Sequence, residues 1–246
     1  MKPIAIVLML SLVAGAAYAQ TPPAGDSGNK VIATVLGKHI TAKDKDKLGG
    51  LIFGTLLERF ANDHKIIATA EEIDTFILKT EEKGQQNLLK FESDRNQLTK
   101  ELKTAILTER ERKEKQSQLQ TIERILKMTR EMEKRTEGNE AQLLPLKRKS
   151  SRPFVRRWKI NKALFAKYGG RVIFQQAGPE PLDAYRGFLQ EQEKKGAFQI
   201  LDEKYKDAFW RYFTHDAMHN FYDKDDGAKF INTPWWMMEQ PAELRK

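Results

Sequence analysis

Cysteine is absent from this chain of 246 residues, which excludes disulfide bonds and lipid anchoring through a cysteine. Long apolar runs are lacking too, because the run from Ile4 to Ala16 is shorter than the ~20 residues that a helix needs to cross a bilayer. No glycine-rich phosphate loop and no G-x-S-x-G motif occurs, so nucleotide binding and the common nucleophilic chemistries have no local support. Without covalent staples, a chain of this size depends on its own hydrophobic core.

The first nineteen residues have the order of a secretory signal peptide. Lys2 precedes the apolar run, and the small residues of Ala17-Tyr18-Ala19 follow it directly before Gln20. This order predicts cleavage between Ala19 and Gln20 and a mature protein in a bacterial periplasm. Residues 20–29 are rich in Pro, Gly and Ser, and we expect them to form a disordered tether.

Positive charge is in excess, with a formal net charge of +9, and much of it lies in one segment. No acidic residue occurs between Glu140 and Glu180. We expect a basic surface there, formed by Lys147, Arg148, Lys149, Arg152, Arg156 and Arg157. For a periplasmic protein, an anionic membrane surface or acidic unfolded chains are more suitable partners than nucleic acid. The alternative is a solvated helix face without a specific role.

The N-terminal part predicts a strand followed by two helices. The β-branched run Val31–Leu36 ends at Gly37, which indicates a strand and a turn. A helix is then expected from Thr41, and its apolar stripe has i, i+4 spacing over Leu48, Ile52, Leu56 and Phe60. A second helix is expected to begin at Thr69, because Glu72 completes a capping box.

A charged segment follows, almost free of Gly and Pro, and predicts a projecting helical arm. No hydrophobic residue lies between Leu107 and Leu119, so pairs such as Glu111–Lys115 would have to sustain the helix there. Two short apolar seams could fold together as an antiparallel hairpin, Leu98, Leu102 and Ala105 on one side and Leu119, Ile122 and Leu126 on the other. A single solvated spacer helix is the alternative. Gly138-Asn139 and Pro145 are expected to end the arm.

The C-terminal third predicts a second packed region. A helix carrying Trp158 should stop at Gly169-Gly170, and Val172–Phe174 suits a short strand. The next helix should begin near Pro181 and end at Gly196, with Leu182, Tyr185, Phe188 and Leu189 on one face. A further helix is expected from about Asp202, rich in aromatic residues as far as Tyr222.

The N-terminal pattern resembles a known family. The strand Val31–Leu36, the piece His39-Ile40-Thr41, the apolar helix and then Thr69–Asp74 resemble the N-terminal chaperone domain of exported foldases of the SurA and PrsA type. The resemblance covers about residues 30 to 80. It implies a discontinuous domain, in which a later helix around Trp158 and the strand Arg171–Phe174 return to pair against Val31–Leu36. The family's parvulin-type isomerase domain is not recognisable, and the charged arm occupies its place.

We therefore expect a mainly α fold, a discontinuous SurA-N-like helical chaperone domain with a small two-stranded β element and a long charged helical arm. The expected parts are a signal peptide (1–19), a tether (20–29), the first part of the chaperone domain (30–78), the arm (79–142) and a C-terminal helical part (143–246).

The expected function is that of a periplasmic chaperone that binds unfolded or nascent envelope proteins without cofactor, metal or isomerase activity. The residues expected to contact clients are aromatic: Phe53, Phe60, Phe188, Phe209, Trp210, Phe213, Trp235 and Trp236. The pair Trp235-Trp236 could instead pack into the core, because adjacent side chains of an extended chain point to opposite sides. A structural envelope protein acting through its arm is the alternative function.

Two histidines in the C-terminal third have the spacing of a known catalytic motif. His215 and His219 stand at i, i+4, as in the H-E-x-x-H motif of zinc peptidases, so both could share a metal from one helix face. Asp216 replaces the glutamate, and its shorter side chain would lie too far from a metal-bound water to act as the base. A metal-dependent hydrolase is therefore the weakest of the three functional hypotheses.

Overall fold

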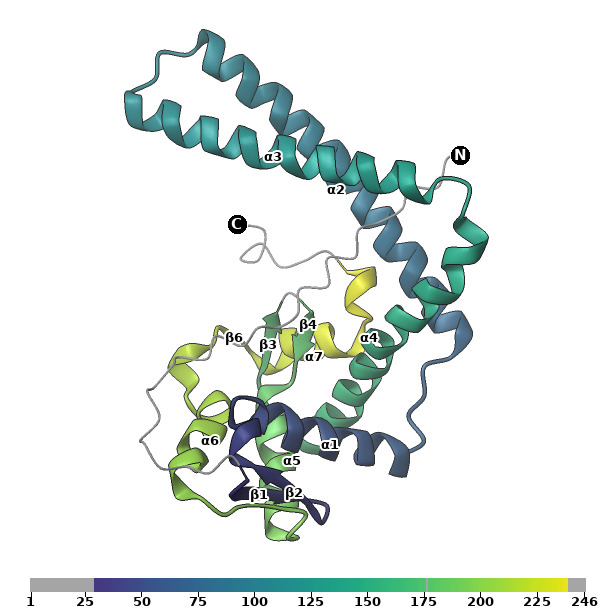
Figure 1. Cartoon of the computed structure of the whole chain (residues 1–246), viewed down its shortest axis with the longest axis vertical. Helices are drawn as coiled ribbons and strands as arrows, with labels where there is room; N and C mark the ends of the chain where they lie inside the picture. The colour runs from purple at the N-terminus through teal and green to yellow at the C-terminus, as the bar shows by residue number, and fades with distance from the viewer. Residues whose placement is uncertain (1–28, 176, 239–246) are drawn as a thin grey trace. The chain divides into compact units, whose positions relative to one another are not determined.

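A computed structural model describes residues 29–175 and 177–238. The predicted signal peptide, its cleavage site at Ala19 and Gln20, and residues 20–28 of the tether lie outside the described residues. The described chain is mainly helical with small antiparallel sheets, which confirms the expected class (Figure 1). It divides into two compact units: a helical unit of residues 70–152, and a body formed by residues 29–69 and 153–238.

The first sheet of the body is built around the predicted N-terminal strand. Strand β1 (Val31–Val35) pairs antiparallel with β2 (Lys38–Thr41) on one side and β5 (Phe198–Ile200) on the other. The connecting turn has Leu36 at φ 48° and Gly37 at φ 77°, the two positive angles of a tight hairpin turn. The prediction that residues 171–174 pair with this strand is wrong, because β5 occupies that edge.

The segment expected to return to β1 instead forms a second sheet. Strand β3 (Val172–Gln175) lies between β4 (Gly178–Glu180) and β6 (Phe221–Tyr222), all antiparallel. The described residues therefore hold two three-stranded sheets, where the sequence predicted one two-stranded element. Strands of two or three residues are too short to show an alternating pattern, so the sequence gives little sign of them.

Helices cover these sheets and supply most of the core. A 3₁₀ turn η1 (Ala42–Lys47) leads into α1 (Leu48–Asp63), whose buried face includes Leu48, Ile52, Leu56 and Phe60, as predicted. Helix α5 (Leu182–Lys194) follows Pro181 and buries Leu182, Tyr185, Phe188 and Leu189, which confirms the second predicted face. The second half of α4 (Glu140–Tyr168) ends before Gly169, which takes φ 65°, as expected for a glycine cap.

The predicted aromatic helix is broken into several elements. A 3₁₀ turn η2 (Glu203–Tyr205) precedes α6 (Lys206–Thr214), which is followed by η3 (Asp216–Met218) and then by β6. The expectation of one helix running to Tyr222 is therefore wrong. Helix α7 (Lys224–Asn232) and the turn η4 (Trp235–Met237) complete the described body.

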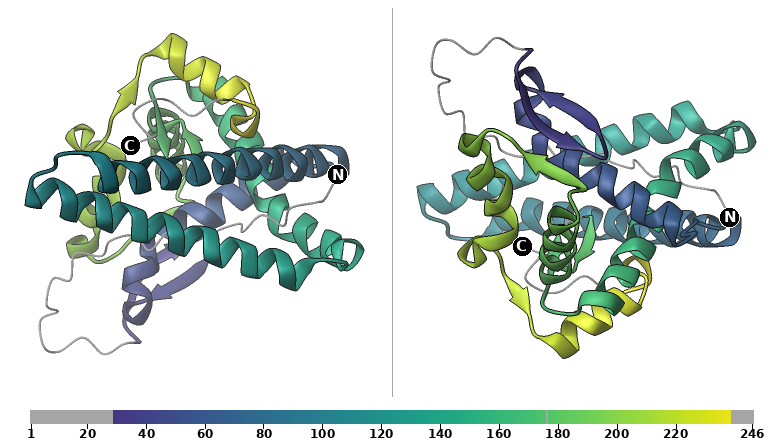
Figure 2. Two further views of the ribbon diagram at one scale, coloured as in Figure 1. Left: turned by 90° about the horizontal axis from the view of Figure 1, so that it is seen from above. Right: turned by 90° about the horizontal axis from the view of Figure 1, so that it is seen from below.

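The helical unit contains the charged arm as a hairpin. Helices α2 (Ala70–Thr104) and α3 (Glu109–Thr136) lie side by side and antiparallel, which favours the hairpin over the single spacer helix (Figures 1 and 2). Thr108 and Glu111 form a capping box at the start of α3. Lys115 bonds Glu101 across the hairpin at 2.6 Å, so the predicted pair Glu111–Lys115 is replaced by an interhelical one.

The end of the arm differs from the prediction at one proline. Helix α3 ends before Gly138, which takes φ 81°, as the Gly138-Asn139 signal indicated. Pro145, however, lies inside α4, which continues to Tyr168. Proline removes one N–H donor from a helix and need not end it when the rest of the helix is well supported. Within the described residues, every helix is too short or too polar to span a membrane.

Candidate functional site

Most of the aromatic residues expected to bind clients belong to the core of the body. Five of the eight are buried: Phe60, Phe188, Phe209, Phe213 and Trp236. Phe53 and Trp210 are half-buried and pack against the same core. The rings meet edge to face, with Phe60 and Phe188 centroids 5.5 Å apart and Phe53 and Tyr185 centroids 4.7 Å apart. This is the geometry of stable aromatic packing, so the surplus of rings is used by the fold.

The tryptophan pair near the C-terminus packs as well. The Trp236 ring lies 5.3 Å from that of Trp158, whose Nε1 donates a hydrogen bond to the Ile231 carbonyl at 2.9 Å. The half-buried Trp235 ring covers Gly178, where an added Cβ would lie 2.6 Å from Trp235 Cδ1. Both rings therefore contact the protein, which favours the packing alternative for this pair.

The basic residues expected to form one surface are divided between the two units and are partly paired. In the helical unit, Lys147 bonds Glu81 at 2.8 Å, and Arg148 makes two 2.7 Å bonds to Asp74. In the body, Arg156 bonds the Glu58 carboxylate and also donates to the Asn62 side chain at 3.0 Å. Arg157 lies over the Phe53 ring, 5.9 Å from its centroid. Lys149 and Arg152 are exposed and make no ion pair within the described part of the chain.

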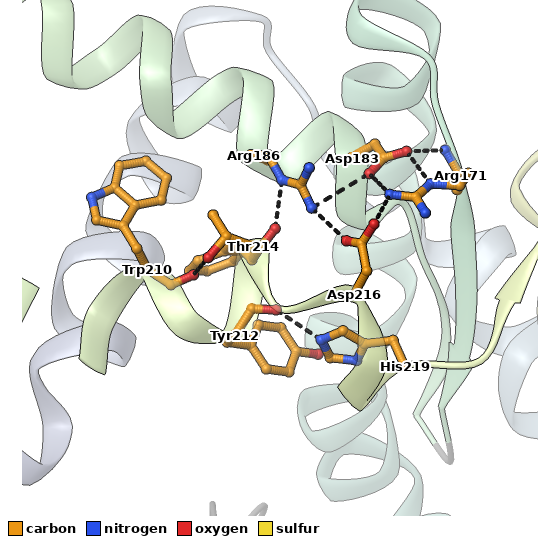
Figure 3. A network of polar contacts seen from close by, with 9 residues as sticks. Arg171, Asp183, Arg186, Trp210, Tyr212, Thr214, Asp216 and His219 are labelled. Carbon is orange, nitrogen blue, oxygen red and sulfur yellow. Dashed lines mark hydrogen bonds and ion pairs between the residues drawn. The ribbon is translucent and has the colours of Figure 1, made fainter. Parts of the chain in front are cut away.

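The two histidines do not share a helix face, so the premise of the zinc-site hypothesis is wrong. Helix α6 ends at Thr214, and His215 is its exposed C-cap residue. The chain then turns to bring Phe221 into the second sheet, and His219 Nε2 is bonded to the Tyr212 carbonyl at 2.8 Å (Figure 3). No group of three or more His, Cys, Asp and Glu residues able to hold a metal ion occurs among the described residues.

Beside the histidines lies a network of four alternating charges (Figure 3). Arg171 donates to Asp183 at 2.9 and 3.0 Å and to Asp216 at 2.8 Å, while Arg186 donates to Asp216 at 2.9 Å. Bonds from both arginines lower the pKa of Asp216, and those from Arg171 outweigh burial in lowering the pKa of Asp183. Gly170 is required here, since an added Cβ would lie 2.3 Å from the Asp183 Cβ.

Two arginines and two aspartates neutralise one another in this network, so it offers neither a free base nor a free nucleophile. It joins the start of β3, helix α5 and the turn η3, which come from distant parts of the C-terminal third. Its bonds tie these three elements together.

A half-buried carboxyl group lies near this network. The Tyr212 hydroxyl donates to Glu180 at 2.7 Å, and Arg157 and His219 provide positive charge nearby. Burial nevertheless raises the pKa of Glu180, which is a common property of functional acids. Burial also raises the pKa of Tyr185, whose hydroxyl is bonded to Asn161 Oδ1 at 2.6 Å. Each of these two groups thus has a hydrogen-bond partner within the body.

The helical unit offers a different kind of surface, an apolar groove where α3 meets α4. Its volume is about 570 Å³. Met132 and Thr136 of α3 line it together with Leu143, Leu146, Lys147, Lys149 and Ser150 of α4. Leu146 is 61 % exposed and Met132 37 % exposed, so these side chains are open to solvent. We call this surface the α3–α4 groove.

Helical spacing produces the α3–α4 groove. Met132 and Thr136 are four residues apart, and Leu143, Leu146 and Ser150 are three and four residues apart, so each helix presents its lining residues on one face. The sequence analysis missed this site, because it assigned Met132 and Thr136 to the charged arm and residues 143–150 to the C-terminal part with its basic surface. The signal that could have found it is the i, i+3, i+7 spacing of residues 143, 146 and 150, which begins just after the Gly138 helix end.

Comparison with known proteins adds no assignment. No protein-family model matches this chain, and neither a curated protein nor a solved structure matches it.

Proposed function

We propose that this protein is an exported chaperone of the SurA and PrsA type, which holds unfolded envelope proteins in the periplasm without isomerase activity of its own. The observation that carries the proposal is the α3–α4 groove, where the exposed side chains of Leu146 and Met132 line one hollow. A partner that covers this groove would remove apolar surface from water, which is favourable. The signal-peptide order and the N-terminal motif supply the expected location and family.

The chemistry of the α3–α4 groove suits partners of variable sequence. Methionine and leucine side chains lack polar groups that would demand a specific hydrogen-bond partner, and methionine is flexible enough to fit irregular surfaces. Surfaces that can repack in this way are typical of promiscuous binders. The charged faces of α2 and α3 would keep a complex with an aggregation-prone client in solution.

The function is tested by diluting a chemically denatured outer-membrane protein with and without the mature chain, and by assaying prolyl isomerisation on the same sample. We expect suppressed aggregation without isomerase activity. The variant Leu146→Glu should lose suppression, because it places a charge in the α3–α4 groove. Leu89→Glu is the matched control, since Leu89 is 67 % exposed on α2 and lies outside the groove.

Two results would contradict the proposal. The first is undiminished aggregation at several-fold excess of the intact chain, and the second is equal suppression by Leu146→Glu and the unmodified protein. Equal helicity of both variants by circular dichroism shows that neither effect comes from misfolding.

A structural envelope protein acting through the α2–α3 hairpin is the second candidate. It is favoured by an open groove of about 540 Å³ between these helices, lined by Leu98 and Ile122 among mainly polar residues. Such a protein should form concentration-dependent oligomers and show no preference for unfolded chains, which light scattering and the aggregation assay distinguish.

A further inference from the structure

The α3–α4 groove has a charge as well as an apolar surface. Two of its lining residues are lysines and none is acidic. Lys147 is already bonded to Glu81 at 2.8 Å, so its charge is partly satisfied within the unit. Lys149 is exposed and makes no ion pair within the described residues, and the same holds for Arg152, three residues further along α4. Lys149 therefore supplies a cation without an ion pair in the lining of the groove, and Arg152 supplies a second one about one helical turn further along α4.

We infer that the clients bound in the α3–α4 groove are short apolar segments with Asp or Glu directly beside the apolar residues. This inference rests on the proposed function and names the class of segment that the groove selects. The apolar side chains of the segment would cover Leu146 and Met132, which contributes about 25 cal/mol for each Å² of apolar surface removed from water. The flanking carboxylates would pair with Lys149 and Arg152.

Ion pairs between exposed groups should affect which segment the groove prefers more than how tightly it binds any one segment. Exposed ion pairs are weak, so we expect two of them to give about a three- to tenfold preference between oppositely charged segments, which corresponds to about 0.7 to 1.4 kcal/mol in total. Salt weakens such pairs, because the Debye length falls to roughly 3 Å at 1 M ionic strength. The apolar part of the interaction should persist in salt.

The test uses two dye-labelled peptides with the same Leu- and Met-containing centre, one flanked by Glu and the other by Lys. Binding to the intact mature chain is followed by fluorescence anisotropy at low and high salt. We expect the Glu-flanked peptide to bind about three- to tenfold more tightly at low salt, and we expect high salt to reduce this ratio.

Variants separate the groove from the general basic charge of the protein, which has a net charge of +9. The double variant Lys149→Glu with Arg152→Glu should abolish or reverse the preference. Lys113→Glu with Lys127→Glu is the matched control, because it makes the same change of charge at exposed positions of α3 that do not line the groove. The control should keep the preference.

Each outcome bears on a different claim. Equal binding of both peptides to the unmodified chain would overturn the charge preference and leave the chaperone proposal standing. A preference that the control pair removes as completely as the groove pair would also overturn it, since general charge would then suffice. Failure of both peptides to bind, together with unsuppressed aggregation, would overturn the proposed function and with it this inference.

Discussion

Helices α5 and α3 show how differently the two units of this protein are held. Helix α5 has 13 residues and buries five of them, whereas α3 has 28 residues and buries only Leu126. The body is therefore stabilised by apolar burial. The hairpin depends far more on local helix formation and on ion pairs such as Glu101–Lys115 and Glu92–Arg130. We therefore expect the hairpin to be less stable than the body and more sensitive to salt.

The positions of the tryptophans make this comparison measurable. All four, Trp158, Trp210, Trp235 and Trp236, belong to the body. Tryptophan fluorescence therefore reports on the body alone, while amide exchange in α2 and α3 reports on the hairpin.

The largest effect is expected from Phe188→Ala in the body. Phe188 is 2 % exposed and packs against Phe60, so its truncation should lower the free energy of unfolding by about 3–5 kcal/mol. Urea unfolding followed by tryptophan fluorescence measures the change. Leu89→Ala on α2 is the control and should change stability by less than about 0.5 kcal/mol. An unchanged urea midpoint for Phe188→Ala would contradict a core role for Phe188 and would favour the original prediction that it contacts clients.

The next effect is expected from Leu126→Ala in the hairpin. Because Leu126 is the buried residue of α3, its loss should reduce the local opening free energy by about 2–3 kcal/mol, at the lower end of the range for buried leucines. Hydrogen exchange of α2 and α3 amides measures this, and Met128→Ala, at a position 49 % exposed, is the control. If the tryptophan midpoint fell by the same amount, the two units would unfold together and the comparison would fail.

Acid should weaken the body through carboxylates that are paired in the folded state. Bonds from Lys195, Tyr168 and Lys167 hold the pKa of Glu191 at about 2, below the roughly 4.3 of an unfolded glutamate. A carboxyl group with a depressed pKa contributes stability that is present above its unfolded pKa and is lost as the pH falls towards its folded pKa. Stability should therefore decrease from about pH 4 towards pH 2.

The variant Glu191→Gln tests this origin of the acid sensitivity. It should lower stability at neutral pH and flatten the decrease between about pH 4 and pH 2, as measured by urea midpoints across that range. Glu193→Gln on the same helix is the control, because Glu193 makes no ion pair within the described residues. If Glu191→Gln lost stability in acid as steeply as the unmodified protein, Glu191 would not be the source of the acid sensitivity.

The smallest effect is expected from salt on the hairpin. Screening weakens exposed ion pairs, so high salt should slightly reduce helicity without moving the tryptophan midpoint. Lys115→Gln should cause a similar loss at low salt and little further loss at high salt, since it removes the 2.6 Å pair with Glu101. Circular dichroism measures both. Equal salt sensitivity of the tryptophan signal would count against the division between the units.

Features with a long and regular pattern could be predicted. The stripe of α1, the face of α5 after Pro181 and the helix end at Gly169 were all found from apolar spacing and from proline and glycine signals. The partner of β1 was not found, because β5 has only three residues and lies far along the chain. Strand pairing is a long-range event that local periodicity does not encode.

The candidate site was harder to predict than the fold. Aromatic residues such as Phe209 and Phe213 suggested a binding site, because one helix face could not bury so many rings. The helix instead ends at Thr214, and the rings are packed against the core from α6 and from β6. Leu146 was passed over, because it lies between Pro145 and Lys147 at the start of a strongly basic segment. Exposure decides which apolar residue can bind a partner, and exposure is a property of the folded chain.

By itself, the sequence determined the helical class, the two main apolar faces and the charged helical arm, since each depends on neighbours within a few turns of the chain. Only the tertiary structure decided which strand pairs with β1, which aromatic rings are buried and where an apolar groove stays open. The physical reason is that backbone geometry acts between nearby residues, whereas burial depends on segments that meet only after folding.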